Sequence, residues 1–325
     1  MGEEILCASC QDGFSITYYC VSWIVNGVMT TLSVIILSYA IDDEIYQMNC
    51  RCLDSLFDSE QWEYGQLQVL LMESNKQNPY TYDERVKVLI PNENFNFHRF
   101  FNIGLSHTDG EFVAFCNNDI IFTKGWFAAI MQVKKEHEEF MCFSPLDRGY
   151  PMMGEETLPS NKSYYIGWEN KKHFAAWCFV WERKVFDIIG LFDETFDFYS
   201  ADDDELQTLR YYAIPNVLVT HSEVKHLSQV VTKKEDLFNP HKIEDREQYP
   251  LTEEEIRRGY SWLWDDDRFY VAYQRMKAKW GNEHVIKRVH HFLERHTRLF
   301  VYPVTRFLYN RKVNEIMRVL MGIKN

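Results

Sequence analysis

Apolar residues in the first 120 positions form short continuous runs separated by polar stretches. Four of these runs are rich in β-branched or aromatic residues and have the length of strands buried on both faces: 32–37, 68–72, 85–90 and 111–116. Acidic residues open a helical stretch over 42–56, and a second helix is expected near 98–105. Strands that alternate with helices predict an α/β fold with a parallel sheet.

The second half of the chain follows a different pattern. A helix is expected over 126–137, and it is followed by a loop-rich segment over 144–172 that contains three prolines and three glycines. We then expect strands at 176–181, 216–220 and 223–225, and helices at 183–189, from the acidic cluster at 202–205 to about 212, and at 273–281. One main domain over 1–282 and a basic helical tail over 283–325 are therefore predicted.

Charge separates the tail from the rest of the chain. The whole chain of 325 residues has a net charge of −13, whereas the tail has nine Lys or Arg against three Glu, which leaves −19 for the residues before it. We expect such a tail to contact phosphates, a membrane surface or another subunit.

The amino-terminal sequence and the cysteines bear on location. No basic region precedes the first apolar run, and polar residues interrupt the membrane-like stretch 14–37, so buried strands are favoured over a transmembrane segment. Of the eight cysteines, several lie in apolar runs, and the Cys7–Cys10 pair has no second pair at zinc-site spacing. We expect a cytoplasmic protein in a reducing compartment.

Polar residues gather where the predicted strands end. Ser38, Glu73, Asn94 and Asp119 all fall at or just beyond a strand. Ligands of parallel α/β sheets bind outside the carboxyl ends of the strands. This edge of the sheet is therefore the predicted ligand site.

Several short motifs occur in a characteristic order. They are Val34 to Ala40, Glu73, Asn94 with Asn102-Ile103-Gly104-Leu105, Asn117-Asn118-Asp119, Trp177 to Val180 with Gly190 to Glu194, Asp202-Asp203-Asp204, and His226. Together they resemble the inverting GT-A glycosyltransferases of family 2, notably the rhamnosyl-like and cell-surface-glycan branch, over about 32–281. The resemblance implies a Rossmann-like nucleotide-sugar-binding half over about 31–125, an acceptor half over about 126–230, a helical closing segment to 282 and a C-terminal helical extension.

The resemblance also implies roles for individual residues. Mn²⁺ or Mg²⁺ is expected at Asp119 and His226 with Asn117, where it would stabilise the leaving diphosphate of a nucleotide-diphosphate sugar. Asp202 is the expected general base for the acceptor hydroxyl, with Asp203 as the second candidate. The expected donor-binding residues are Ser38, Glu73, Asn94, Asn102 and Asn118.

Other interpretations of the same residues stay open at this stage. The Asn-Asn-Asp run is also typical of a polar turn, and the acidic cluster is typical of a helix amino terminus, where mutual repulsion should raise at least one pKa. The acceptor is a glycan or, through the basic and aromatic tail, a hydroxymethylated DNA base. Because Ala201 and Asn117 replace two acidic residues of the family pattern, a catalytically degenerate sugar-nucleotide-binding protein is the remaining alternative.

Overall fold

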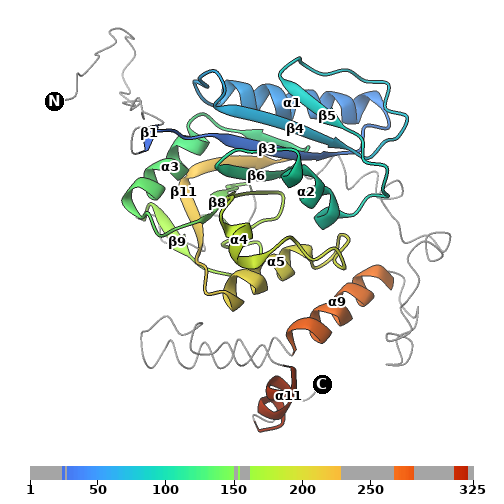
Figure 1. Ribbon diagram of the computed structural model, residues 1–325, viewed down its shortest axis with the longest axis vertical. Coiled ribbons are helices and arrows are strands. Elements are labelled where there is room, and N and C mark those ends of the chain that lie inside the picture. The colour runs from blue at the N-terminus through green and yellow to red at the C-terminus, as the bar shows by residue number, and fades with distance from the viewer. Residues whose placement is uncertain are drawn as a thin grey trace.

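A sheet of nine strands forms the centre of the molecule, as the computed structural model shows (Figure 1). The structure describes residues 24–25, 28–149, 153, 162–227, 267–281 and 311–320. Eight strands lie in the order β5-β4-β3-β6-β10-β8-β11-β7, and β9 pairs with β11. Helices pack on this mixed sheet, so the predicted α/β class is confirmed.

The first half of the sheet is parallel. It contains β3 (Leu32–Ser38), β4 (Leu67–Glu73), β5 (Val86–Leu89) and β6 (Phe112–Asn117), each within two residues of a predicted strand. All seven residues of β3 are buried, as expected for a strand covered on both faces. The parallel register brings the carboxyl ends of β3, β4 and β6 to one edge.

Three helices of this half begin at residues that suit a helix amino terminus. In α1 (Asp43–Asp58) and α2 (Phe97–Ser106), the side chains of Asp42 and Asn96 accept hydrogen bonds from the backbone N–H groups of Ile45 and Arg99. The third helix, α3 (Trp126–Glu136), begins after Gly125, whose φ of 78° favours glycine.

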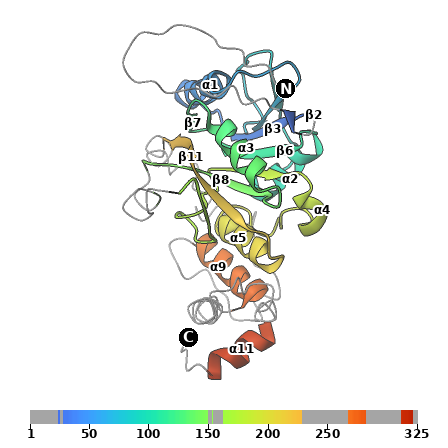
Figure 2. The same cartoon turned by 90° about the vertical axis from the view of Figure 1, so that its left-hand side faces the viewer.

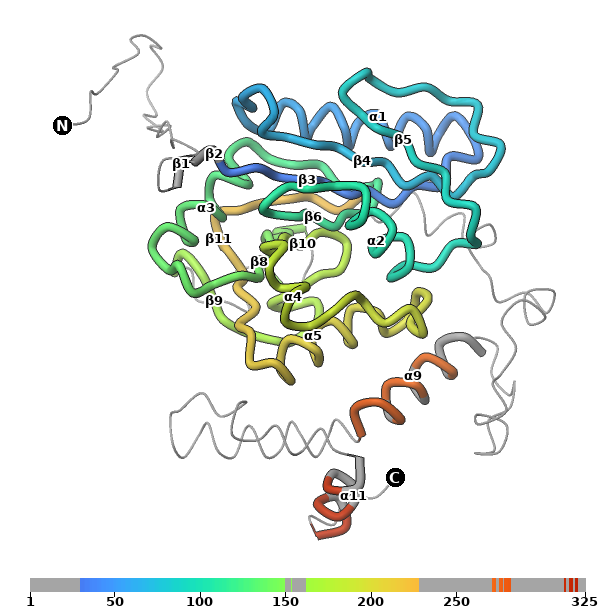
Figure 3. The backbone as a smooth tube through the Cα atoms, viewed as in Figure 1, coloured from blue at the N-terminus to red at the C-terminus, as the bar shows by residue number. Residues whose placement is uncertain are grey.

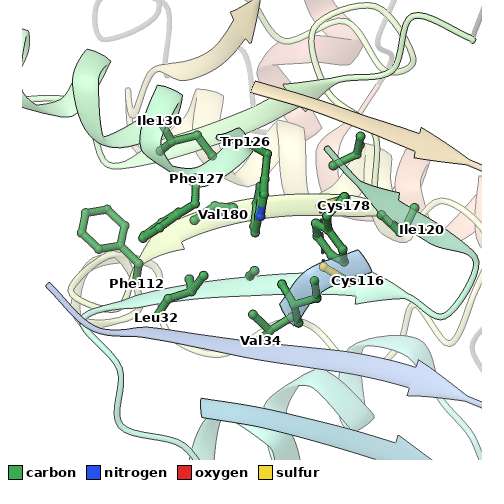
Figure 4. Close-up of a cluster of buried hydrophobic side chains, with 14 of the residues drawn as sticks. Leu32, Val34, Phe112, Cys116, Ile120, Trp126, Phe127, Ile130, Cys178 and Val180 are labelled. Atoms are coloured by element: carbon green, nitrogen blue, oxygen red, sulfur yellow. Dashed lines mark hydrogen bonds between the residues drawn. The ribbon is translucent and has the colours of Figure 1, made fainter. Parts of the chain in front are cut away.

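Side chains on the two faces of the sheet form separate cores. Alternate residues of β3 (Leu32, Val34, Ile36) pack with α1 and α3 on one face, and Figure 4 shows Trp126, Phe127 and Ile130 of α3 over this face. The intervening Ile35 and Leu37 pack with α2, α4 (Val185–Ile189) and α5 (Ala201–Tyr211) on the other face. The molecule therefore has helix, sheet and helix layers.

Close packing of α2 on β3 depends on Gly104. A Cβ atom at this position would lie 2.7 Å from Cγ2 of Ile35, which is shorter than van der Waals contact. The absence of a side chain lets the helix approach the strand.

The second half of the sheet departs from the predicted pattern. Here β10 (Cys178–Glu182) runs antiparallel between β6 and β8 (Cys142–Leu146). The expected loop at 144–172 thus begins inside a strand, since residues 144–146 belong to β8 although they include Pro145. It also contains β9 (Tyr164–Ile166), and β7 (Ile120–Phe122) directly follows the Asn-Asn-Asp run; neither short strand was predicted.

The two short strands expected at 216–220 and 223–225 are one strand, β11 (Asn216–His226). Its partners on β8 are consecutive at Pro145 and Leu146, whereas the paired residues of β11 are Val219 and Glu223. Three residues of β11 are therefore accommodated in a bulge. Beyond it, the strand pairs antiparallel with β7, with His226 opposite Ile120.

Two helices near the carboxyl end lie beyond α5 (Figures 1 and 3). They are α9 (Asp267–Trp280) and α11 (Arg311–Leu320), and the remainder of the predicted basic tail lies outside the described residues. Near the amino end, β1 (Ile24–Val25) and β2 (Val28–Met29) form an antiparallel pair within the membrane-like stretch. In the described part of the chain, no helix has both the length and the apolar character needed to cross a bilayer.

The described cysteines are free thiols, and four of the five are buried. Cys116 and Cys178 face each other across β6 and β10 with their Sγ atoms 3.6 Å apart. Burial raises the pKa of the Cys116 thiol well above its usual range, so both behave as core hydrophobes. The Cys7–Cys10 pair lies outside the described residues.

Candidate active site

Hydrogen bonds join the carboxyl ends of β3 and β4. Ser38 and Glu73 are register partners, and the Ser38 hydroxyl donates to Oε2 of Glu73 at 2.8 Å. The other carboxylate oxygen of Glu73 accepts from the backbone N–H groups of Asn75 at 2.7 Å and Ala40 at 3.1 Å. Glu73 is fully buried. Its carboxylate therefore holds together the backbone that follows β3 and the backbone that follows β4.

Asn49 of α1 connects the end of β3 to the loop after β6. Its amide nitrogen donates to the Ser38 hydroxyl and to the Tyr82 hydroxyl, both at 2.8 Å. Its amide oxygen accepts from Nδ2 of Asn118 at 2.6 Å. Asn49 is fully buried, and the sequence analysis did not identify it, because it lies inside a helix and away from any strand end.

Asp119 lies in the turn between β6 and β7, where it meets His226 from the far end of β11. Its Oδ2 is 3.1 Å from Nε2 of His226, and its backbone carbonyl accepts from the N–H of Leu227 at 2.8 Å. The Trp177 ring stacks on the imidazole, with centroids 4.8 Å apart and planes within 2°. Asn117, the last residue of β6, donates its backbone N–H to the Trp177 carbonyl at 2.9 Å.

The chemistry of this pair fits a divalent cation that shares its ligands with a substrate. Asp119 is 3% exposed, and its Oδ1 has no hydrogen-bond partner within the described residues. A buried carboxylate oxygen of this kind needs a hydrogen-bond donor or a cation as its partner. The described residues contain no cluster of three or more His, Cys, Asp or Glu that could hold a metal. Asp119 and His226 are the candidate carboxylate and imidazole ligands, Asn117 stays the expected amide ligand, and the other positions would be left to substrate oxygens and water.

Asp147 is a neighbour that the sequence analysis missed. It follows β8 and is 3% exposed. Its Oδ2 accepts from the backbone N–H of His226 at 3.3 Å, and its Oδ1 accepts from the N–H of Gly149 at 2.9 Å. An Asp directly after an apolar run is typical of a strand end, so Asp147 could have been identified from the sequence. It was not, because Pro145 argued against a strand over 142–146.

Asp202 and Asp203 lie in the first turn of α5, half-buried. The amide of Asn170 donates to Oδ2 of Asp202 at 2.6 Å and to Oδ1 of Asp203 at 3.2 Å, and Oδ1 of Asp202 accepts from the N–H of Asp203 at 3.0 Å. The helix amino terminus stabilises carboxylates. Both side chains are therefore fixed in orientation.

The next two acidic residues of this cluster face the interior. Asp204 accepts from the Trp280 indole N–H at 2.6 Å and lies 2.9 Å from Nζ of Lys279, which ties α5 to α9. Glu205 lies 3.3 Å from Nε2 of His98, and both side chains are fully buried.

The pKa values in this cluster are set first by burial. Burial raises the pKa of the Glu205 carboxyl well above its usual range, with a further contribution from Asp202 and its acidic neighbours, and burial lowers the pKa of the His98 imidazole. The pKa of Asp204 is also raised by burial, against the opposing effect of Lys279. Mutual repulsion, the cause expected from the sequence, is the smaller contribution.

Two residues expected to bind the donor have other surroundings than Ser38 and Glu73. Asn102 of α2 bonds with its amide to the backbone of Phe192, and its Nδ2 lies 3.2 Å from Oε1 of Glu194, so it anchors the Gly190-to-Glu194 motif. Asn94 is exposed in the loop between β5 and α2. None of the hydrogen bonds found in the described residues joins either side chain to Ser38, Glu73 or Asn118.

Comparisons with known proteins give a family and distant structural likenesses. Residues 33–189, just under half of the chain, match the family described as Glycosyl transferase family 2. No curated protein matches the chain in sequence.

Among solved structures, that of GalNAc-T7 with UDP, GalNAc and Mn²⁺ is 13% identical, with a TM-score of 0.47, over 60% of this chain and 43% of that one. The structure of TarS from S. aureus is 14% identical, with a TM-score of 0.45, over 65% of this chain and 38% of that one. The chain thus spans less than half the length of either protein. The segment that resembles glycosyl transferase family 2 includes Ser38, Glu73 and the Asn117-to-Asp119 turn.

Proposed function

We propose that the chain is a metal-dependent inverting glycosyltransferase of the rhamnosyl-like and cell-surface-glycan branch. It would move a sugar from a nucleotide-diphosphate sugar to a hydroxyl of a glycan. The observation that carries the proposal is the Asp119–His226 pair at the strand edge of a segment that matches family 2. One buried carboxylate oxygen of this pair has no hydrogen-bond partner among the described residues.

In this mechanism, Asp119 and His226, with Asn117, would hold the cation. Mn²⁺ or Mg²⁺ bound there would neutralise negative charge on the diphosphate leaving group. Trp177 keeps the imidazole plane fixed by stacking, and the backbone contacts of Asp119 and His226 hold the two side chains at one distance. The hydrogen-bonded pair Ser38 and Glu73 is joined to Asn118 through Asn49. Together they would shape the surface on which the nucleotide would lie.

Asp202 acts as the base. Its carboxylate takes the proton of the acceptor hydroxyl while that oxygen bonds to the anomeric carbon and the bond from this carbon to the diphosphate oxygen breaks. Attack opposite to the leaving group inverts the anomeric configuration. The hydrogen bond from Asn170 fixes the orientation of the Asp202 carboxylate at the α5 amino terminus, as this role requires.

Donor binding is tested by thermal unfolding of the full chain with UDP-, GDP- and dTDP-sugars, with and without Mn²⁺. A ligand of the native state raises the unfolding temperature, and we expect one nucleotide class to do so only with Mn²⁺. Asp119→Asn should abolish this effect, whereas Asp54→Asn, an exposed carboxylate on α1, should keep it. Because Asp119 is the one carboxylate among the expected ligands, Mn²⁺ alone should bind weakly. Metal-independent stabilisation by every nucleotide tested would contradict the proposed site.

Transfer is tested separately from donor binding. Asp202→Asn should retain the metal-dependent stabilisation and lose transfer to an oligosaccharide; full transfer by this variant would move the base to Asp203 or elsewhere. Transfer to hydroxymethylated DNA, weakening steeply as salt rises, would instead identify DNA as the acceptor. Donor binding without either transfer or hydrolysis would indicate a degenerate sugar-nucleotide-binding protein.

A further inference from the structure

Exposed apolar side chains are concentrated on α11. Nine large hydrophobic side chains are exposed in the described residues, and three of them, Ile316, Val319 and Leu320, lie in this ten-residue helix at 61%, 70% and 74% exposure. The other six are scattered over the body of the protein. Helical spacing places Ile316 and Leu320 on one stripe, with Val319 beside it. Among the described residues, these three side chains form an exposed apolar face.

The helix is attached to the body at its edge. Met317 packs against Trp280 of α9, whereas α9 itself is anchored to α5 and to Asp193 through Lys279 and Trp280. Both views place α11 beyond α9, at the end of the molecule away from α1 (Figures 1 and 2). The exposed side chains of Ile316, Val319 and Leu320 lie at this end.

The charge of the same segment indicates which surface. The sequence of α11 has Arg311, Lys312 and Arg318 against Glu315, within a tail of net charge +6. An amphipathic helix with an apolar face and excess Lys and Arg lies in the interface of anionic membranes. We propose that α11 docks the protein on an anionic lipid surface, with Ile316, Val319 and Leu320 inserted among the lipids.

Two other occupants suit these residues less well. Three aliphatic side chains cover on the order of 300 Å², well below the ~800 Å² that each partner buries in a stable protein interface. Nucleic-acid bases stack on aromatic rings, and the three large hydrophobic side chains described as exposed on α11 are all aliphatic. A lipid surface needs only a small inserted area combined with attraction of charge.

Vesicle flotation of the full chain tests the proposal. Phosphatidylcholine vesicles that contain phosphatidylglycerol should carry the protein, and phosphatidylcholine alone or high salt should not. The double variant Ile316→Glu/Leu320→Glu should lower partitioning about 100-fold or more through lost apolar insertion. Neutralising Arg311, Lys312 and Arg318 to Gln should lower it about 100-fold, at roughly fivefold for each cation.

The matched control is Leu191→Glu, which changes an apolar side chain of 64% exposure on the body and should leave partitioning unchanged. Equal flotation of the double variant and the unchanged chain would overturn the proposal. So would self-association of the unchanged chain without vesicles that the double variant loses, because it would make a second copy the occupant. The readout is binding, so the result is independent of whether the chain transfers sugars.

Discussion

Asn49 offers a direct test of whether the strand ends are built as one unit. Replacing it with Ala removes three hydrogen bonds, to Ser38, Tyr82 and Asn118. A buried hydrogen bond contributes about 1 kcal/mol, so the loss is about 3 kcal/mol, and the better helix propensity of Ala returns roughly 0.5 kcal/mol. The unfolding free energy should therefore fall by about 2.5 kcal/mol.

Urea unfolding of the full chain measures this loss, and Asp54→Ala on the exposed side of the same helix is the control. The control shares the gain in helix propensity and loses no buried partner, so it should change stability by less than about 0.5 kcal/mol. In the Asn49→Ala variant, metal-dependent stabilisation by the nucleotide sugar should also weaken, because the Ser38 turn and the Asn118 loop are no longer joined. Equal stability of the two variants would refute the interpretation that Asn49 couples these loops.

Three further predictions concern the residues that position the site. Glu205→Gln should stabilise the protein more at about pH 7 than at about pH 5. The raised pKa of the Glu205 carboxyl contributes stability that is lost as the pH rises above the unfolded value of about 4.3, at up to about 1.4 kcal/mol per pH unit. An equal change in unfolding free energy at the two pH values, measured by urea unfolding, would contradict this prediction. Gly104→Ala should lower the free energy of unfolding by about 1–3 kcal/mol despite the helix propensity of Ala, and a second change of Ile35→Ala should cost less in that variant than in the unchanged chain, as urea unfolding would measure. Asp204→Ala should release the Trp280 indole, so that its fluorescence is quenched by added acrylamide more readily, whereas Asp203→Ala should leave this quenching unchanged.

Local sequence was sufficient for the parallel half of the fold. The continuous apolar runs of β3, β4 and β6 specify strands covered on both faces, and Asp42 and Asn96 mark the helix starts. The antiparallel half was less predictable. Pro145 is normally evidence against a strand, yet β8 is completed by its pairing with β10 and β11, which is a tertiary effect.

The site shows the same division. The turn that carries Asp119 follows directly from a buried strand, so its place at the sheet edge could be predicted. The contacts of Asn49 and Asp147 could not be predicted. Those of Asn49 depend on which face of α1 meets the strand ends, and those of Asp147 depend on the register of β8 in the folded sheet. Asn102 illustrates the converse: a motif position expected beside the nucleotide serves to hold the backbone of Phe192.

The bulge in β11 has a consequence for how this region can vary. Side chains alternate between the faces of a strand, so the number of residues between Val219 and His226 decides which way the imidazole points. Exchanging Thr220, His221 or Ser222 for other residues leaves that count unchanged, whereas deleting one of them turns the imidazole away from Asp119. Natural or engineered diversity should therefore be greatest at the exposed His221, with the buried Ser222 kept small and the length of 220–222 fixed.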